Sequence, residues 1–211
     1  MTTDHAFSIG YGAGIRAPLE LVMEAHARAI AGELAPERLH ELPAATGVRE
    51  RYYPFLYHLA ALLKPARIVE VGVCQGVSLA HLAAGAPPTC QVMGVDNNPT
   101  QILDIAMVKH LVAYGDSVID AEKFATKYGN GLPIDLLFLD ASKQPEEWPA
   151  WRPFCSENVV VCVDDRIAQQ SELWASVKTP AKIELDDLHA VPFGEHEHTG
   201  FGVFIGRDDA P

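Results

Sequence analysis

The sequence of 211 residues lacks the features that mark several large classes of protein. It has no run of Lys or Arg, and a net charge of −12 with a pI of about 5.1 repels a phosphate backbone. No apolar stretch has the length of a membrane span, and the N-terminal segment holds an acid and glycines without the apolar core of a signal peptide. We therefore expect a cytoplasmic protein that binds neither nucleic acid nor membranes.

Cysteine is also scarce. The four cysteines form no CxxC pair, which argues against a zinc or thioredoxin-type site, and free thiols in a reducing compartment are the simplest interpretation. What the sequence does contain is 48% hydrophobic and 21% charged residues, a composition typical of soluble globular proteins. The length fits one domain that buries a substantial core.

The pattern of the chain changes near residue 65. Residues 1–64 read as a helical cap, with apolar residues at helical spacing over Leu19–Leu34 and an aromatic and leucine-rich segment over Glu50–Leu63. A break containing Pro and Gly, Leu42–Gly47, separates these two segments. Residues 65–211 form the expected α/β core of a single domain.

In this core, short apolar segments alternate with helical ones. The predicted strands are Arg67–Val71, Gln91–Asp96, Leu111–Tyr114, Ile134–Asp140, Asn158–Asp165, Lys182–Leu185 and Gly202–Gly206. Helices are expected at Gly76–Ala84 and from near Pro99 onward. Two more are expected, one after the third strand that extends as far as Phe124 and one after the fifth strand that extends as far as Trp174. Apolar strands that alternate with helices are typical of a parallel sheet covered on both faces. We therefore predict a doubly wound, mostly parallel seven-stranded α/β fold.

Acids or glycines follow the carboxyl ends of five predicted strands, where doubly wound folds bind their ligands. These positions are Glu70-Val71-Gly72, Asp96, Gly115-Asp116, Asp140 and Asp164-Asp165. Any one of the acids is explained equally well as a helix cap. The whole set at one edge of one sheet favours a ligand site.

The loop after the first strand indicates the kind of ligand. Its glycines, Gly72 and Gly76, have the spacing G-x-x-x-G, whereas a nicotinamide-binding loop has G-x-G-x-x-G. Glu70 would be unfavourable beside a pyrophosphate but suits the ammonium group of an amino-acid tail. Asp96 after the second strand can accept hydrogen bonds from ribose hydroxyls, and Asp116 or Ser117 after the third can bond the edge of an adenine.

These residues resemble a known family. The segment Val69-Glu70-Val71-Gly72-x-x-x-Gly76-x-Ser78, with Asp96 and Gly115-Asp116-Ser117, resembles class I methyltransferases that use S-adenosylmethionine (SAM). The resemblance covers roughly Arg67 to Asp165, plus the segment Gly202–Gly206. It implies SAM as the cofactor, bound by Glu70, Gly72, Gly76, Ser78, Asp96, Asn97, Asp116 and Ser117.

The fourth and fifth strands end in three carboxylates, those of Asp140, Asp164 and Asp165. Carboxylates that converge at neighbouring strand ends repel one another unless a cation lies between them. Oxygen ligands with room for water are what Mg²⁺ prefers. The other interpretation is that Asp164 is the strand-end acid of a metal-free enzyme and Asp165 a helix N-cap.

The pattern Phe138-Leu139-Asp140-x-x-Lys143, followed by Val163-Asp164-Asp165, resembles the catechol O-methyltransferase family. The resemblance implies that Asp140, Asp164 and Asp165 bind Mg²⁺ and that Lys143 is the general base, with Asp140 beside it in catalysis. Asp165 stands where that family usually has Asn; an acid at this position is found in the cephalosporin hydroxylase-like group. Ala141-Ser142 replace a bulky pair that lines the acceptor pocket in the catechol O-methyltransferase family. A solvated loop lysine is the alternative for Lys143.

We therefore expect a SAM-dependent O-methyltransferase that acts on a small-molecule acceptor with the help of Mg²⁺. A metal-free methyltransferase, a hydroxylase-like relative and a non-catalytic SAM-binding domain stay open, as does a homodimer. Four further features receive structural interpretations: an exposed loop for Glu195–His198, packing of a short helix for Trp148 and Trp151, a core-facing aromatic stripe for Tyr52, Tyr53, Phe55 and Tyr57, and an entry segment for Gly10–Gly14.

Overall fold

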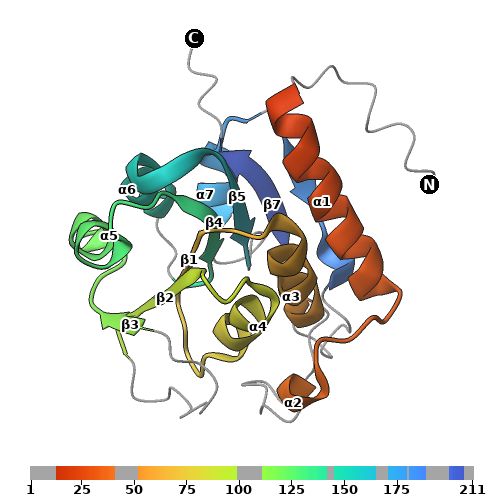
Figure 1. Ribbon diagram of the computed structural model, residues 1–211. Helices are drawn as coiled ribbons and strands as arrows, with labels where there is room; N and C mark the ends of the chain where they lie inside the picture. Colours follow the sequence, from red (N-terminus) through yellow and green to blue (C-terminus); the bar gives the residue numbers. More distant parts are fainter. Residues whose placement is uncertain are drawn as a thin grey trace, which may run out of the picture.

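The computed structural model describes residues 13–40, 52–98, 111–141, 145–164, 171–179, 181–188 and 200–206. Within these residues the chain forms one seven-stranded sheet with helices on both faces (Figure 1). The strand order is β3-β2-β1-β4-β5-β7-β6. The strands are β1 Arg67–Val71, β2 Gln91–Asp96, β3 Leu111–Tyr114, β4 Ile134–Leu139, β5 Cys155–Val163, β6 Lys182–Glu184 and β7 Gly202–Gly206. The predicted fold class is confirmed.

The sheet is parallel from β3 to β5 and antiparallel at its last two pairings. Strand β7 lies between β5 and β6 and runs against both of them. Strand β5 begins three residues earlier than predicted, because Cys155 pairs with Ile134 of β4 across an irregularity in the register. The carboxyl ends of β1 to β5 therefore lie along one edge of the sheet.

Two layers of helices cover the sheet (Figure 1). Three helices share a core with one face: α1 Ala13–Ile30, α3 Tyr52–Leu63 and α4 Val77–Gly85. Three others pack on the opposite face: α5 Ala121–Gly129, α6 Glu147–Trp151 and α7 Ser171–Ser176. A short helix, α2 Glu37–His40, and two 3₁₀ turns, Arg152–Phe154 and Asp186–Leu188, complete the described elements.

The alternation of side chains along β1 assigns its residues to these two layers. Ile68 packs with the α3 and α4 layer, whereas Val69 and Val71 pack with the α5 and α6 layer. Successive side chains of a strand point to opposite faces, so Glu70 shares the face of Ile68. The carboxylate of Glu70 is therefore directed toward α4.

Of the four aromatic residues predicted to face the core from α3, Tyr52 and Phe55 are buried as predicted, whereas Tyr53 and Tyr57 are half-buried. Tyr52, Phe55 and Leu59 are buried at helical spacing and belong to the core that α3 shares with the sheet. Phe55 meets Phe201, which precedes β7, edge to face with ring centroids 5.6 Å apart. Helix α3 thus packs against the sheet near the start of β7, the strand that lies beside β5.

The packing interpretation of the two tryptophans is also confirmed. Trp151 is fully buried in the second core, and Trp148 packs edge to face on Phe204 of β7 at 5.1 Å between ring centroids.

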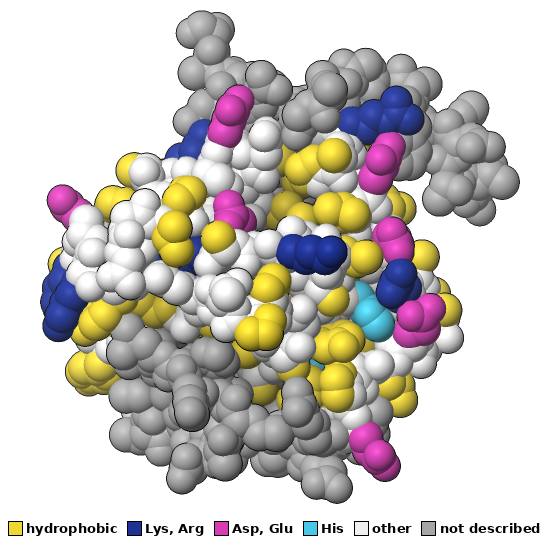
Figure 2. All heavy atoms as spheres, in the orientation of Figure 1, with side chains coloured by type: hydrophobic (Ala, Val, Ile, Leu, Met, Phe, Trp, Pro, Cys, Tyr) yellow, Lys and Arg dark blue, Asp and Glu magenta, His cyan; other side chains and the backbone are white. Residues whose placement is uncertain are grey.

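On the face of the molecule shown in Figure 2, the Lys and Arg side chains of the described residues lie scattered among acidic ones. No helix among the described residues is both long and apolar enough to span a membrane.

We predict that Phe55→Ala lowers the free energy of unfolding by about 3–5 kcal/mol, because it removes a fully buried ring between α3 and the sheet. Leu34→Ala is the control, since Leu34 is 60% exposed and its truncation should change stability by less than about 0.5 kcal/mol. Urea denaturation followed by circular dichroism measures both. Equal, small effects of the two variants would contradict the shared core.

Candidate active site

The loop between β1 and α4 has a backbone that two glycines make possible. Gly72 and Gly76 have φ values of +89° and +83°, in the region that favours glycine. A Cβ atom on Gly72 would also lie 2.6 Å from the Cα atom of Ala141, which follows β4. The loop after β1 therefore lies directly against the chain that leaves β4, and the two predicted parts of the site are adjacent.

Helix α4 begins at this loop without a side-chain cap. Gly76 occupies the N-cap position, and its N–H donates to the carbonyl of Val73 at 2.7 Å. The first N–H groups of a helix carry partial positive charge and have no partner within the helix. This end of α4 can therefore receive a carboxylate from a ligand.

Glu70 is fully buried beneath the same loop. The Ser78 hydroxyl donates to Glu70 Oε1 at 2.5 Å, and Oε2 has no hydrogen-bond partner among the described residues. Burial raises the pKa of Glu70 to about 8; the Ser78 hydrogen bond opposes this shift, and the charge of Asp96 adds to it. Such a carboxylate can be stabilised by a cation or a donor that reaches Oε2.

Asp96, at the end of β2, holds the glycine loop. Its Oδ2 accepts hydrogen bonds from the N–H groups of Val73 at 2.8 Å and Cys74 at 2.9 Å, and its Oδ1 accepts one from Asn98 at 2.6 Å. A carboxylate offers about four lone-pair positions, so capacity for a further donor remains. Binding of ribose by Asp96, and by the exposed Asn97 beside it, stays a prediction.

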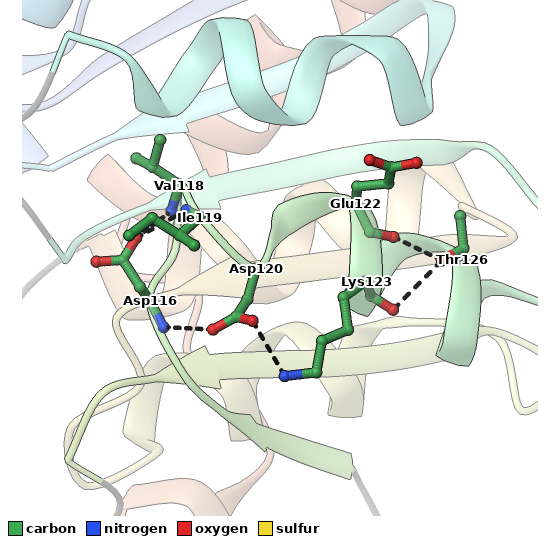
Figure 3. Close-up of polar contacts among 7 residues, drawn as sticks. All are labelled: Asp116, Val118, Ile119, Asp120, Glu122, Lys123 and Thr126. Atoms are coloured by element: carbon green, nitrogen blue, oxygen red, sulfur yellow. Dashed lines mark hydrogen bonds and ion pairs between the residues drawn. The ribbon is translucent and has the colours of Figure 1, made fainter.

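The turn after β3 is built around Asp116 (Figure 3). Its Oδ1 accepts hydrogen bonds from the N–H groups of Val118 at 2.9 Å and Ile119 at 2.8 Å, while its own N–H donates to Asp120 Oδ2 at 3.1 Å. The carboxylate of Asp116 thus stabilises its own turn. Contact of Asp116 or Ser117 with an adenine stays a prediction.

Ser117 makes a contact that the sequence did not suggest. Its hydroxyl donates to Glu147 Oε1 at 2.7 Å, and Glu147 is fully buried at the start of α6. The two residues are 30 positions apart, and Glu147 belongs to no recognised motif. Only the packing of α6 against α5 brings this carboxylate to the edge of the sheet.

Asp140 and Asp164 lie directly beyond the adjacent parallel strands β4 and β5. The Asp140 N–H donates to the carbonyl of Val71 at 2.8 Å, and the Asp164 N–H donates to the carbonyl of Leu139 at 3.1 Å. Asp164 is buried and Asp140 is half-buried. The structure therefore brings together two of the three predicted metal ligands, next to the loop after β1.

Tyr52 reaches this pair of carboxylates from α3. Its ring is nearly parallel to that of Phe201, with centroids 5.6 Å apart. Burial, followed by the charges of Asp164 and Asp140, raises the pKa of Tyr52 well above its usual value. Tyr52 is thus both a core residue and a neighbour of the candidate metal ligands, whereas the sequence pattern favoured only the first role.

No protein-family model and no curated protein matches the sequence. Solved structures do match. An O-methyltransferase from Bacillus cereus in complex with S-adenosylhomocysteine (SAH) has a TM-score of 0.58 at 18% identity, covering 95% of this chain and 94% of that one. TomG from Streptomyces achromogenes, an O-methyltransferase of tomaymycin synthesis in complex with SAM, has a TM-score of 0.58 at 19% identity, covering 96% and 93%. A methyltransferase from Geobacter sulfurreducens has a TM-score of 0.54 at 16% identity, covering 88% of each chain.

The chain has the fold of the class I SAM-dependent methyltransferases. The resemblance that the sequence motifs indicated is therefore matched by the architecture over nearly the whole chain. In this methyltransferase fold, the residues predicted to bind SAM all lie at the carboxyl edge of β1, β2 and β3 or, for Ser78, in the first turn of α4.

Several predicted features of the candidate site lie outside the described residues. These are Lys143, Asp165, the loop Glu195–His198, residues 10–12 of the glycine-containing N-terminal segment, the break at residues 42–47 and the helix expected from near Pro99. Within the described residues, no group of three or more His, Cys, Asp or Glu side chains could hold a metal ion. The predicted set of three carboxylates is not tested by that finding, because Asp165 is a member of it.

All four cysteines of the methyltransferase fold are free thiols, as expected. Cys162 is buried in β5, and burial raises the pKa of its thiol. Burial also raises the pKa of Cys90 to about 11 and that of Cys155 to about 12. These three thiols are therefore poor nucleophiles at neutral pH.

We predict that Glu70 makes stability depend on pH. Its pKa in the folded protein, about 8, lies above the ordinary value of 4.5, so between these values the folded state binds more protons than the unfolded state. The free energy of unfolding should fall with rising pH in this window, by up to about 1.4 kcal/mol per pH unit, and level off above it. Glu70→Gln should remove this contribution, and urea denaturation from pH 5 to 9 compares the variants. Parallel profiles would show that Glu70 ionises normally.

Proposed function

We propose that the protein transfers a methyl group from SAM to a hydroxyl of a small molecule with the help of Mg²⁺. The observation that carries the proposal is the Glu70 carboxylate, which is fully buried and has one oxygen without a hydrogen-bond partner in the part of the chain that the structure describes. A buried acid of this kind is unfavourable unless a donor or cation reaches it. The ammonium group of SAM supplies both.

The other residues at this edge fit the remaining parts of SAM. The N-terminus of α4, left without a side-chain cap by Gly76, suits the carboxylate of the methionine tail. Asp96 and Asn97 lie where a ribose would extend beyond β2, and Ser117 lies where an adenine would reach beyond β3. When bound, SAM supplies a methyl group on a positively charged sulfur, which an oxygen nucleophile can take in a single displacement.

The carboxylates of Asp140 and Asp164 fit a magnesium ion in their chemistry. Both are oxygen donors at adjacent strand ends, and Mg²⁺ uses one or two carboxylates together with water. Asp165 is the third ligand by resemblance to the catechol O-methyltransferase family. A bound Mg²⁺ would lower the pKa of an acceptor hydroxyl.

In this proposal the chain itself orients the acceptor and removes its proton. Lys143 follows Asp140 by three positions and is the base that takes the proton from the hydroxyl. Tyr52 of α3 packs on Phe201 close to Asp140 and Asp164, and these two buried rings would exclude water on that side of the site. Proximity and orientation of the two reactants then provide most of the rate enhancement, as expected for a displacement at carbon.

SAH binding should release a proton from Glu70. At pH 6.5 the raised pKa keeps Glu70 protonated in the free protein, and a bound ammonium group favours the ionised carboxylate. Calorimetry of SAH binding in two buffers of different ionisation enthalpy should therefore show release of up to one proton. Glu70→Gln should release none and bind SAH about tenfold or more weakly.

The outcomes separate two parts of the proposal. Absence of SAH and SAM binding at millimolar ligand would remove the methyltransferase function altogether. Binding that is tight but independent of the buffer would leave the cofactor in place and remove the ammonium contact of Glu70.

Mg²⁺ binding should depend on Asp164. Titration of the EDTA-treated protein with Mg²⁺ should show a site that Asp164→Asn weakens about tenfold or more, because a neutral amide replaces a charged ligand. Glu146→Gln is the matched control, since Glu146 is an exposed acid near the same edge. Equal Mg²⁺ affinity in all three proteins would favour a metal-free methyltransferase. The same conclusion would follow if EDTA left the rate of SAM turnover with phenolic acceptors unchanged.

A further inference from the structure

The contact between Ser117 and Glu147 joins the turn after β3 to the start of α6. Ser117 is half-buried, Glu147 is fully buried, and the oxygen atoms are 2.7 Å apart. A fully buried acid is rare in proteins unless it is paired, as Glu147 is with Ser117. Its position here follows from packing, since Trp151, one helical turn later, is fully buried in the core shared with α5.

This hydrogen bond fixes the direction in which the Ser117 hydroxyl can act. A hydroxyl has one hydrogen to donate and two lone pairs to accept with. The Ser117 hydrogen is directed to Glu147 Oε1, so the oxygen of Ser117 offers lone pairs to any other partner. Ser117 can therefore accept a hydrogen bond from a ligand but not donate one.

The turn that carries Ser117 is fixed against the rest of the site. The Gly115 N–H donates to the carbonyl of Asp96 at 3.1 Å, which links the turn to the strand end expected to face the ribose. Asp116 is held by two N–H groups of its own turn (Figure 3). A nucleobase that extends from a ribose at Asp96 toward β3 therefore meets the Ser117 oxygen with its direction already set.

We infer that Glu147 is a positioning residue for nucleobase specificity, which holds the Ser117 hydroxyl as an acceptor for the 6-amino group of adenine. The inference rests on the proposed function. Adenine presents hydrogen-bond donors at its 6-amino group, whereas the 6-oxo base hypoxanthine presents an acceptor there. An acceptor fixed opposite an oxo group leaves two lone pairs facing each other without a hydrogen, which is unfavourable.

The test compares SAH with S-inosylhomocysteine, its 6-oxo analogue, by calorimetry on the intact protein. The wild-type protein should bind SAH at least about tenfold more tightly. In Glu147→Gln the side-chain amide can donate to Ser117, which frees the hydroxyl hydrogen for the 6-oxo group, so the preference should fall toward one. Ser117→Ala removes the acceptor and should also lower the preference. Glu146→Gln, a change of an exposed acid next to Glu147, should keep the wild-type ratio.

The ratio of two affinities is a readout that a merely structural role of Glu147 would not move. Thermal unfolding checks that each variant is folded. If Glu147→Gln does not fold, the affinity ratio measured for Ser117→Ala tests the inference by itself. SAH binding with an unchanged ratio in the folded variants would overturn this inference and leave the proposed function intact. Failure of the wild-type protein to bind SAH would overturn both.

Discussion

The carboxylate of Asp96 holds the glycine loop in place, and the geometry of the candidate site depends on that contact. Two N–H groups of the loop, from Val73 and Cys74, converge on one oxygen of Asp96. Charge-assisted hydrogen bonds of this kind are stronger than neutral ones. They fix the path of the chain from β1 into α4, and with it the direction in which the N-terminus of α4 points.

The same contact has an electrostatic consequence for Glu70. Glu70, at the end of β1 beside this loop, is fully buried, so its ionised form becomes unfavourable. The negative charge of Asp96 adds to the effect. Glu70 is therefore protonated in the free protein below about pH 8, and a cationic ligand that stabilises its ionised form would release that proton on binding.

Much of this arrangement could be predicted from the sequence, because it is encoded locally. Strands β1, β2, β3 and β7 begin and end where the apolar runs do, and both glycines of the predicted loop, Gly72 and Gly76, have positive φ values. The partners of the side chains could not be predicted in the same way. The contact of Ser117 with Glu147 and the approach of Tyr52 to Asp164 join segments that no periodicity relates. Such pairs follow from the packing of helices on the sheet, which a single sequence does not specify.

The contrast between loops encoded by the local sequence and contacts made by packing explains why the fold points to the cofactor more strongly than to the acceptor. The parts of the site assigned to SAM are loops that directly follow β1, β2 and β3, and their backbone geometry follows from the strands themselves. Near Asp140 and Asp164, Tyr52 of α3 packs on Phe201 from the segment before β7, and these two residues come from distant parts of the chain. Residues that pack there from separate elements can change without disturbing the loops that would hold SAM. We therefore expect acceptor specificity to be determined mainly by α3 and the segment before β7, and cofactor specificity by the turns after β1 to β3.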